Sequence, residues 1–334
     1  MRPRAVAVAV ALAAALLGAS PAHALVIGIG DQKPDMFSDK RFTALDIGYA
    51  RYSIPWDVMR SPSDLARLTD WLDAAKAAGV QPLLTFGHSL RPDKRRTMPT
   101  PAQFRAEFVK LRRAFPWVRT FATWNEANHC GEPYCHKPEK AAELYRALTA
   151  SCPKCTILAA ELLDEPNMVD WVKAFVHQLG WWPRYWGLHN YLDANRWRTT
   201  GTQALLDATK RSQIWLTETG GVVARRNAST ITFPMNTKHA AQSVSWIFRM
   251  LVPLSPRITR VYLYEWQAST TYDTWDSALI NPHGKIRPAF TVMSKQQRQL
   301  VARAKQEQGD GPTETTSDPP GLTASGQTAS GQTG

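Results

Sequence analysis

Two glutamates stand at the ends of two short, largely apolar segments of the chain. Glu126 lies in Trp124-Asn125-Glu126-Ala127-Asn128, at the end of the segment 118–124, and Glu218 follows Ile214-Trp215-Leu216-Thr217. Hydrolysis of a glycosidic bond requires one carboxyl group that protonates the leaving oxygen and a second that attacks or stabilises the anomeric carbon. We therefore interpret Glu126 and Glu218 as a candidate catalytic pair.

Two further acids end predicted strands and are weaker candidates. Glu161 follows an apolar segment but has no motif around it, and Glu265 directly precedes Trp266. Side-chain alternation along a strand would send Glu265 to the face opposite Trp266, so we rank both acids behind the pair. An acid at a strand end can also serve only in a rim salt bridge, and this alternative stays open for Glu126 and Glu218.

Apolar segments that alternate with amphipathic segments supply the scaffold for these acids. The predicted strands are 25–30, 47–56, 82–86, 118–124, 156–160, 185–191, 214–217 and 260–264. The predicted helices run from a cap at Ser63 or Asp64 to Gly79, and over 101–115, 138–148, 168–179, 203–210, 238–251 and 288–302. This order predicts the α/β class and a single (β/α)8 TIM barrel, whose active site lies at the carboxyl ends of the strands.

The two ends of the chain differ in composition from its centre. Residues 1–24 combine Arg2 and Arg4, an apolar run and Ala22-His23-Ala24, which predicts a signal peptide cleaved near Ala24 and a secreted or extracytoplasmic protein. Residues 309–334 are rich in Gly, Pro, Ser and Thr, which predicts a disordered tail. The barrel domain would then occupy 25–308. No segment is long and apolar enough to predict a transmembrane helix.

The formal net charge is +12, and removal of Arg2 and Arg4 with the signal peptide leaves +10. A basic surface can merely aid solubility or can hold an acidic glycan or envelope surface, and both alternatives stay open. The basic loop 91–96 and Arg225-Arg226 would favour an anionic polysaccharide if they border the cleft. Aromatic residues are not interleaved with a basic helical stripe, so we expect no nucleic-acid partner.

Four cysteines form two close pairs in the sequence, Cys130 with Cys135 and Cys152 with Cys155. Disulfides are the default for an exported chain, and three pairings are formally possible, of which we favour the two local loops. A structural zinc site made of all four cysteines is the less favoured alternative. We expect no metal or other cofactor in the candidate active site.

The chain contains 13 tryptophans, most of which we expect in the core. Sugar faces stack on exposed indole rings, so tryptophans near strand ends are the better candidates for sugar binding. These candidates are Trp56, Trp186, Trp197, Trp266 and Trp275.

At several of these positions the chain resembles the retaining glycoside hydrolases of clan A, and most closely family 39 and its bacterial relatives. The matching positions are Trp124-Asn125-Glu126, Thr217-Glu218, Arg51, Trp56, His189, Tyr191, Trp266 and the run 276–285. Ala127 departs from the pattern, because many relatives carry proline there. The resemblance extends over most of residues 25–302.

The resemblance implies a role for each matching side chain. Glu126 would be the general acid/base and Glu218 the nucleophile, with Asn125 bonded to the sugar hydroxyl next to the anomeric carbon. His189 or Tyr191 would orient Glu218, and Arg51 would keep Glu218 ionised. The resemblance thus implies six substrate-binding residues: Arg51, Trp56, Asn125, His189, Tyr191 and Trp266. Proximity to Glu218 and burial should raise the pKa of Glu126.

The sequence therefore predicts a secreted, monomeric, retaining glycoside hydrolase that acts on a polysaccharide or oligosaccharide. The alternative is a non-catalytic carbohydrate-binding or cell-envelope protein built on the same barrel. The presence of both acids favours the enzyme. The sugar, its linkage and the choice between endo and exo action depend on loop shape and are not predicted.

Overall fold

Nine parallel strands form one curved sheet in the computed structural model, which describes residues 25–226 and 232–309. The predicted signal peptide and residues 310–334 of the predicted tail lie outside the described residues. In sheet order the strands are β5 (Thr156–Leu158), β4 (Thr120–Ala122), β3 (Gln81–Gly87), β2 (Tyr49–Pro55), β1 (Val26–Gly30), β10 (Ile258–Tyr264), β8 (Gln213–Thr219), β7 (Tyr185–His189) and β6 (Glu161–Leu163).

The two outermost strands of this order, β5 and β6, follow each other directly in the sequence. β5 pairs with β4 and β6 pairs with β7, so one stretch of chain connects the two ends of the sheet. The backbone nitrogen of Ala159 also donates to Tyr185 O at 2.9 Å, and that of Glu161 donates to Trp124 O at 2.9 Å. These bonds nearly close the sheet and confirm the predicted (β/α)8 barrel.

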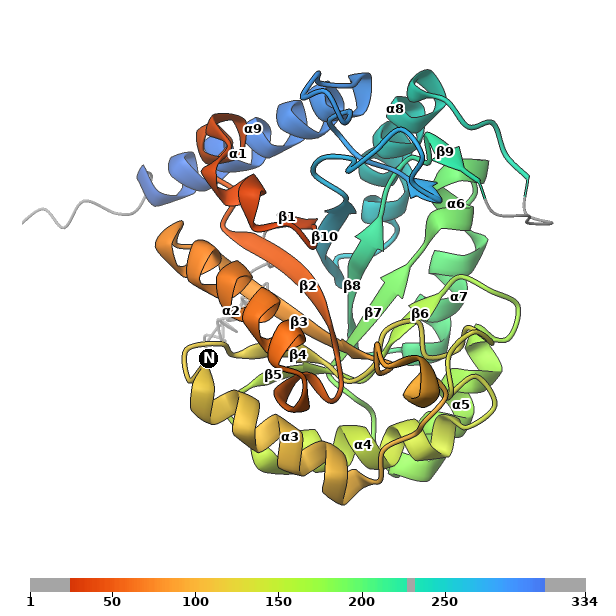
Figure 1. The fold of residues 1–334 in the computed structure, drawn as a ribbon. Coiled ribbons are helices and arrows are strands. Elements are labelled where there is room, and N and C mark those ends of the chain that lie inside the picture. Colours follow the sequence, from red (N-terminus) through yellow and green to blue (C-terminus); the bar gives the residue numbers. More distant parts are fainter. Residues whose placement is uncertain (1–24, 227–231, 310–334) are drawn as a thin grey trace, which may run out of the picture.

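Helices surround the strands (Figure 1). They are α1 (Lys40–Ala44), α2 (Pro62–Ala77), α3 (Pro101–Ala114), α4 (Pro138–Ser151), α5 (Met168–Leu179), α6 (Tyr191–Arg196), α7 (Thr200–Thr209), α8 (Thr237–Trp246) and α9 (Pro288–Gly309). α8 continues as a π-helical turn over Ile247–Leu251. α9 runs past the predicted domain end at residue 308 by one residue.

Many element boundaries differ from the predictions by a few residues, and three differences affect the placement of elements around the site. α2 is capped by Ser61, whose hydroxyl accepts from the backbone of Asp64, because Pro62 can occupy the first helical position at no cost in hydrogen bonds. The predicted fifth strand, 156–160, ends at Leu158 as β5, and a further strand that was not predicted, β6, begins at Glu161. The predicted sixth strand ends at His189, and Tyr191 instead begins α6.

The barrel interior is filled by side chains from five strands. Its buried cluster consists of Leu83, Ala122, Leu158, Trp215 and Tyr262. Gly28 on β1 has no side chain, and a Cβ there would lie 2.6 Å from the ring of Tyr262. Glycine at this position therefore leaves room for a tyrosine inside the barrel.

The four cysteines form the two local disulfides that the sequence favoured. Cys130 pairs with Cys135 and Cys152 with Cys155, with Cα–Cα distances of 4.8 and 5.3 Å. The alternative of a four-cysteine zinc site is therefore wrong, because a disulfide sulfur is not a thiolate ligand. Among the helices of residues 25–226 and 232–309, none is long and apolar enough to cross a membrane.

We expect Gly28→Ala to destabilise the barrel, because the new methyl group would displace Tyr262. Overpacking of this kind typically costs about 1–3 kcal/mol of unfolding free energy. Gly48→Ala is the matched control, because a Cβ at Gly48 meets nothing within 4 Å. Urea unfolding of both variants measures the difference, and equal stabilities would contradict the packing argument.

Candidate active site

Arg51 lies at the centre of the hydrogen-bond network at the carboxyl ends of the strands. Its side chain is 1 % exposed, and its Nη1 donates to Glu218 Oε2 at 2.7 Å. Its Nε donates to Glu161 Oε1 at 2.9 Å, and Nη2 donates to Asn125 Oδ1 at 2.7 Å. A buried guanidinium group is tolerated only when it is paired in this way, so Arg51 fixes the side chains around it.

Glu161 is the site residue that sequence reasoning undervalued. It begins β6, is fully buried, and accepts two hydrogen bonds from Arg51 and one from Thr85 Oγ1 at 2.9 Å. Gly187 on β7 leaves the space for this side chain, because a Cβ there would lie 2.6 Å from Glu161 Cγ. Glu161 therefore supports Arg51 and is shielded from any substrate.

Glu126 sits on a tight turn that follows β4. Its φ angle is +47°, a left-handed conformation that non-glycine residues rarely adopt and that costs about 1–3 kcal/mol. The turn is held on both sides, because Asn125 N donates to Phe86 O at 2.7 Å and Ala127 N donates to Glu161 O at 2.9 Å. This backbone conformation presents the Glu126 carboxylate to the barrel mouth.

His189 and Tyr191 have separate partners in the structure. The Tyr191 hydroxyl donates to Glu218 Oε1 at 3.2 Å, whereas His189 Nδ1 lies 3.1 Å from Glu126 Oε1 and its Nε2 lies 3.2 Å from Glu161 Oε2. Of the two residues that could have oriented Glu218, Tyr191 therefore makes the contact. His189 instead connects Glu126 to the buried acid Glu161.

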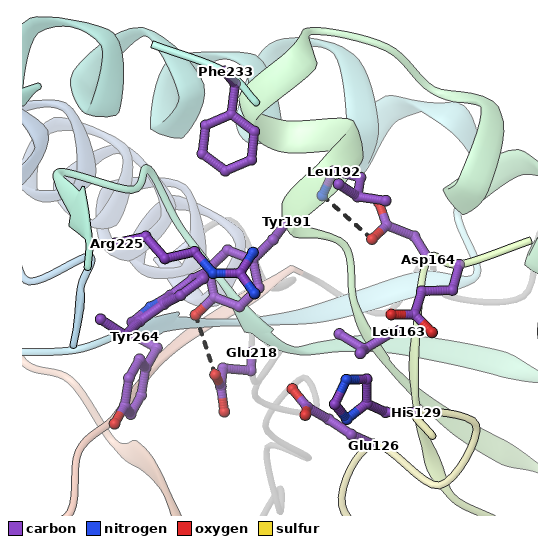
Figure 2. A pocket seen from close by; sticks show the side chains of 12 residues that line it. Glu126, His129, Leu163, Asp164, Tyr191, Leu192, Glu218, Arg225, Phe233 and Tyr264 are labelled. Atoms are coloured by element: carbon purple, nitrogen blue, oxygen red, sulfur yellow. Dashed lines mark hydrogen bonds between the residues drawn. The ribbon is translucent and has the colours of Figure 1, made fainter. Parts of the chain in front are cut away.

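Glu126 and Glu218 face the same cavity, which has a volume of about 340 Å³ (Figure 2). One carboxylate oxygen of each and a ring nitrogen of His189 all lie within 4.8 Å of one another. Both acids are partly accessible, with side-chain exposures of 26 % and 16 %. Two carboxylates this close, both open to one cavity, match the roughly 5–5.5 Å spacing of retaining glycosidases.

Aromatic rings form much of the cavity wall. They belong to Tyr191, Phe233, Tyr264 and Trp275. Trp275 was a predicted sugar-binding candidate, whereas Phe233 and Tyr264 were missed, although Tyr264 ends a predicted strand and could have been found from that signal. The rings of Tyr191 and Trp275 pack edge to face with their centroids 4.7 Å apart, and this contact fixes both rings.

Polar groups complete the wall on two sides. β9 (Ala224–Arg225) pairs with β11 (Trp275–Asp276), and this pairing holds the Arg225 guanidinium 5.5 Å from the centre of the Trp275 ring. His129, Asp164 and Glu165 also line the cavity, and His129 lies beside Glu126 (Figure 2). The cavity therefore combines one cation with several acids.

Three of the five tryptophans predicted as sugar-binding candidates are buried. Trp266 is 1 % exposed and packs edge to face against Phe42 and Phe290, and Trp56 is 4 % exposed. Neither lines the cavity. Their rings belong to the buried hydrophobic core. Trp186 is also fully buried, which removes it from the sugar-binding candidates.

The basic loop 91–96 does not line the cavity. Arg96 Nη1 donates to Gly131 O at 3.0 Å, beside the Cys130–Cys135 disulfide, and Arg91 lies 3.6 Å from Asp57. The loop thus braces its neighbours. Of the basic residues that the sequence connected with an anionic substrate, Arg225 is the one that borders the cavity.

The buried network changes the proton affinity of its members. Burial disfavours the charge on His189, but Glu218 and the hydrogen bonds to Glu126 and Glu161 outweigh this and raise the pKa of His189 to about 9. Burial also disfavours the charge on Glu161, but Arg51 and His189 lower its pKa to about 2. Near neutral pH, His189 is therefore an imidazolium between two carboxylates.

The expected direction of the Glu126 pKa was wrong. Burial does act to raise it, but the hydrogen bond and charge of His189, followed by His129 and Arg51, lower the pKa of Glu126 below its ordinary value. The sequence predicted desolvation without the neighbouring imidazolium. In the free protein, the proton expected on Glu126 therefore resides on His189.

The trio of Glu126, His189 and Glu218 has the atom types and spacing of a cation site. However, Glu218 already accepts from Arg51 and Tyr191, and the Arg51 charge would repel a metal ion placed beside it. The described residues at this site thus favour charge neutralisation by the protein itself.

The barrel is similar to those of several solved glycosidase structures. Xylanase 10B from Thermotoga maritima superposes with a TM-score of 0.58 at 12 % identity, over 86 % of this chain and 97 % of that one. A glucosidase from Croceicoccus marinus superposes with a TM-score of 0.59 at 11 % identity, over 83 % of this chain and 67 % of that one. A GH113 beta-1,4-mannanase superposes with a TM-score of 0.52 at 13 % identity, over 82 % of this chain and 98 % of that one.

At these identities the likeness shows the fold alone. No family model matches the sequence, and no curated protein does. Any assignment of function thus has to rest on the geometry of the cavity and its side chains.

We expect Glu161→Gln to lower the His189 pKa and the stability together, because it removes the charge between Arg51 and His189. Breaking a buried pair typically costs about 3–5 kcal/mol. Glu107→Gln is a matched control, since Glu107 is equally buried but pairs with Arg60 and Lys110 on the barrel exterior. NMR titration of His189 and urea unfolding measure both effects, and an unchanged His189 titration in Glu161→Gln would contradict the network.

The raised pKa of His189 also predicts a pH dependence of stability. Because the folded value of about 9 exceeds the ordinary 6.5, His189 stabilises the fold fully below pH 6.5, and this contribution is lost as the pH rises to 9. The loss is at most about 3 kcal/mol. Unfolding free energies of the wild type and His189→Gln, measured across this range, should converge at high pH, and parallel curves would refute the assignment.

Proposed function

We propose that the protein is a retaining glycoside hydrolase that cleaves a β-linked glycan by double displacement. The observation that carries this proposal is the approach of Glu126 and Glu218 to within 4.8 Å on the wall of one cavity. The wall aromatics offer flat surfaces for sugar rings. A barrel of the same fold also occurs in a xylanase, a beta-1,4-mannanase and a glucosidase, so the fold is compatible with this reaction class.

In the first step, Glu218 attacks the anomeric carbon and the bond to the leaving oxygen breaks. Arg51 and Tyr191 fix the orientation of Glu218, because both donate to its carboxylate. Burial and the charge of Glu218 raise the pKa of Tyr191, so its hydroxyl retains the proton that it donates. Asn125 is held by Arg51 through its Oδ1, which directs its amide group to the sugar hydroxyl beside the reacting carbon.

The leaving oxygen receives its proton from Glu126, which obtains it from His189. Their atoms lie 3.1 Å apart, so the proton can move along one hydrogen bond. A bound sugar displaces water from the cavity and disfavours the ion pair relative to the neutral pair, which places the proton on Glu126. In the second step, Glu126 takes a proton from water, and that water replaces Glu218 on the sugar.

The same proposal includes an exported, monomeric protein with a polysaccharide or oligosaccharide substrate. Two disulfides suit an oxidising compartment outside the cytosol. Arg225 on the cavity wall would favour an acidic group on the glycan, but Asp164 and Glu165 lie on the same wall. We therefore propose the glycan class without requiring it to be anionic.

We expect Glu126→Gln and Glu218→Gln to abolish hydrolysis while the protein stays folded. Loss of a general acid typically lowers kcat by about 10²–10⁴-fold, and loss of the nucleophile should cost at least as much. The assay measures reducing sugar released from a panel of plant and microbial polysaccharides, with folding checked by circular dichroism. The control is Glu143→Gln, because Glu143 pairs with Lys140 on the surface of α4, away from the cavity.

Two further measurements test the mechanism itself. The first product should keep the β configuration at its anomeric carbon, as followed by proton NMR. Azide should rescue Glu218→Ala with formation of an α-glycosyl azide, because it attacks the face that Glu218 left open. An inverted first product, or full activity in either glutamine variant, would overturn the proposal.

A further inference from the structure

A second hollow, of about 240 Å³, lies on the outer side of α6 and α8. Its lining combines two indole rings with long polar side chains: Trp197, Gln242, Ser245, Trp246, Arg249 and Met250. Trp197 is 43 % exposed and Met250 is 42 % exposed, so two large apolar side chains at this hollow are open to solvent. The hollow thus offers flat apolar faces with hydrogen-bonding groups at their edges.

A row of stacked rings connects this hollow with the catalytic cavity. Phe233, on the cavity wall, stacks on His239 with centroids 6.5 Å apart and planes at 14°. Trp197, on the hollow, stacks on the same imidazole at 5.0 Å and 28°. The two concave regions are therefore linked through three stacked rings, of which the middle one, His239, is buried.

The row is held rigidly to the residues that position Glu218. His239 Nε2 lies 2.9 Å from Asn195 O, and Trp246 Nε1 donates to Arg198 O at 3.1 Å. α6 begins at Tyr191, which bonds to Glu218, and Trp197 follows its last residue with a φ of +51°. The two centroid distances, 6.5 Å and 5.0 Å, place the rings of Phe233 and Trp197 no more than 11.5 Å apart, a span that an oligosaccharide can bridge.

From this arrangement we propose that the hollow is an outer glycan subsite, which binds a distal sugar of the chain whose scissile bond lies between Glu126 and Glu218. The inference rests on the proposed function and extends it, because it assigns a chain-like substrate rather than a short glycoside. Trp197 supplies the stacking face, and Gln242 and Arg249 lie where they can bond to sugar hydroxyls. Because the rings are already fixed, binding loses little conformational freedom.

The test compares Trp197→Ala with Trp182→Ala. Trp182 is a matched control, because it is 48 % exposed and lies in the segment between α5 and β7, at the opposite end of the barrel from the catalytic residues. We expect Trp197→Ala to lose about tenfold more kcat/KM on a long oligosaccharide than on a short chromogenic glycoside of the same sugar, as a single aromatic contact would give. Trp182→Ala should show equal values on both substrates relative to the wild type.

A second readout separates this inference from the proposed function. In the Glu218→Gln background, added Trp197→Ala should weaken retention on an immobilised glycan by about tenfold, and Gln242→Ala, an exposed helix position, should weaken it to a smaller degree. Equal losses on long and short substrates, or unchanged retention, would overturn the outer subsite while hydrolysis stands. If retention depends on Trp197 but the wild-type protein hydrolyses no glycan, the proposed hydrolase function is overturned and the sugar-binding hollow stands.

Discussion

The pairing of one buried guanidinium with two carboxylates is the interaction on which the rest of the site depends. Arg51 lies inside the barrel, where an unpaired cation would cost several kcal/mol, and it is balanced by Glu161 and Glu218. With the His189 imidazolium and the Glu126 carboxylate, the network contains two positive and three negative groups. The excess negative charge is located around Glu126 and Glu218, where it would favour the positive charge of an oxocarbenium-like state.

The network also explains the break between β5 and β6. β5 pairs with β4, the chain then shifts at Ala159 and Ala160, and β6 pairs with β7. This shift places Glu161 under Arg51, in the space that Gly187 leaves open. Closure of the barrel and the placement of its buried counter-charge are therefore produced by the same stretch of backbone.

Much of the fold could be predicted because parallel strands buried on both faces leave a strong apolar signal. Glu126 and Glu218 were found because each ends a predicted strand, and Tyr191 because the resemblance to clan A glycosidases included it. Glu161 was undervalued, since its partner Arg51 lies 110 residues away and no local motif marks the contact. Trp56 and Trp266 were misplaced for a related reason: sequence locates a ring near a strand end but does not show whether that ring is buried.

The location of the catalytic proton shows the same limit at the level of chemistry. Sequence reasoning gave Glu126 a raised pKa from burial and from a nearby acid, and burial does act in that direction. The pKa of Glu126 is lowered instead, because His189 lies between Glu126 and Glu161 and binds its proton more tightly than either acid does. The protonation state of an acid at a strand end therefore depends on the charged side chains that the barrel places next to it, and those side chains come from strands distant in sequence.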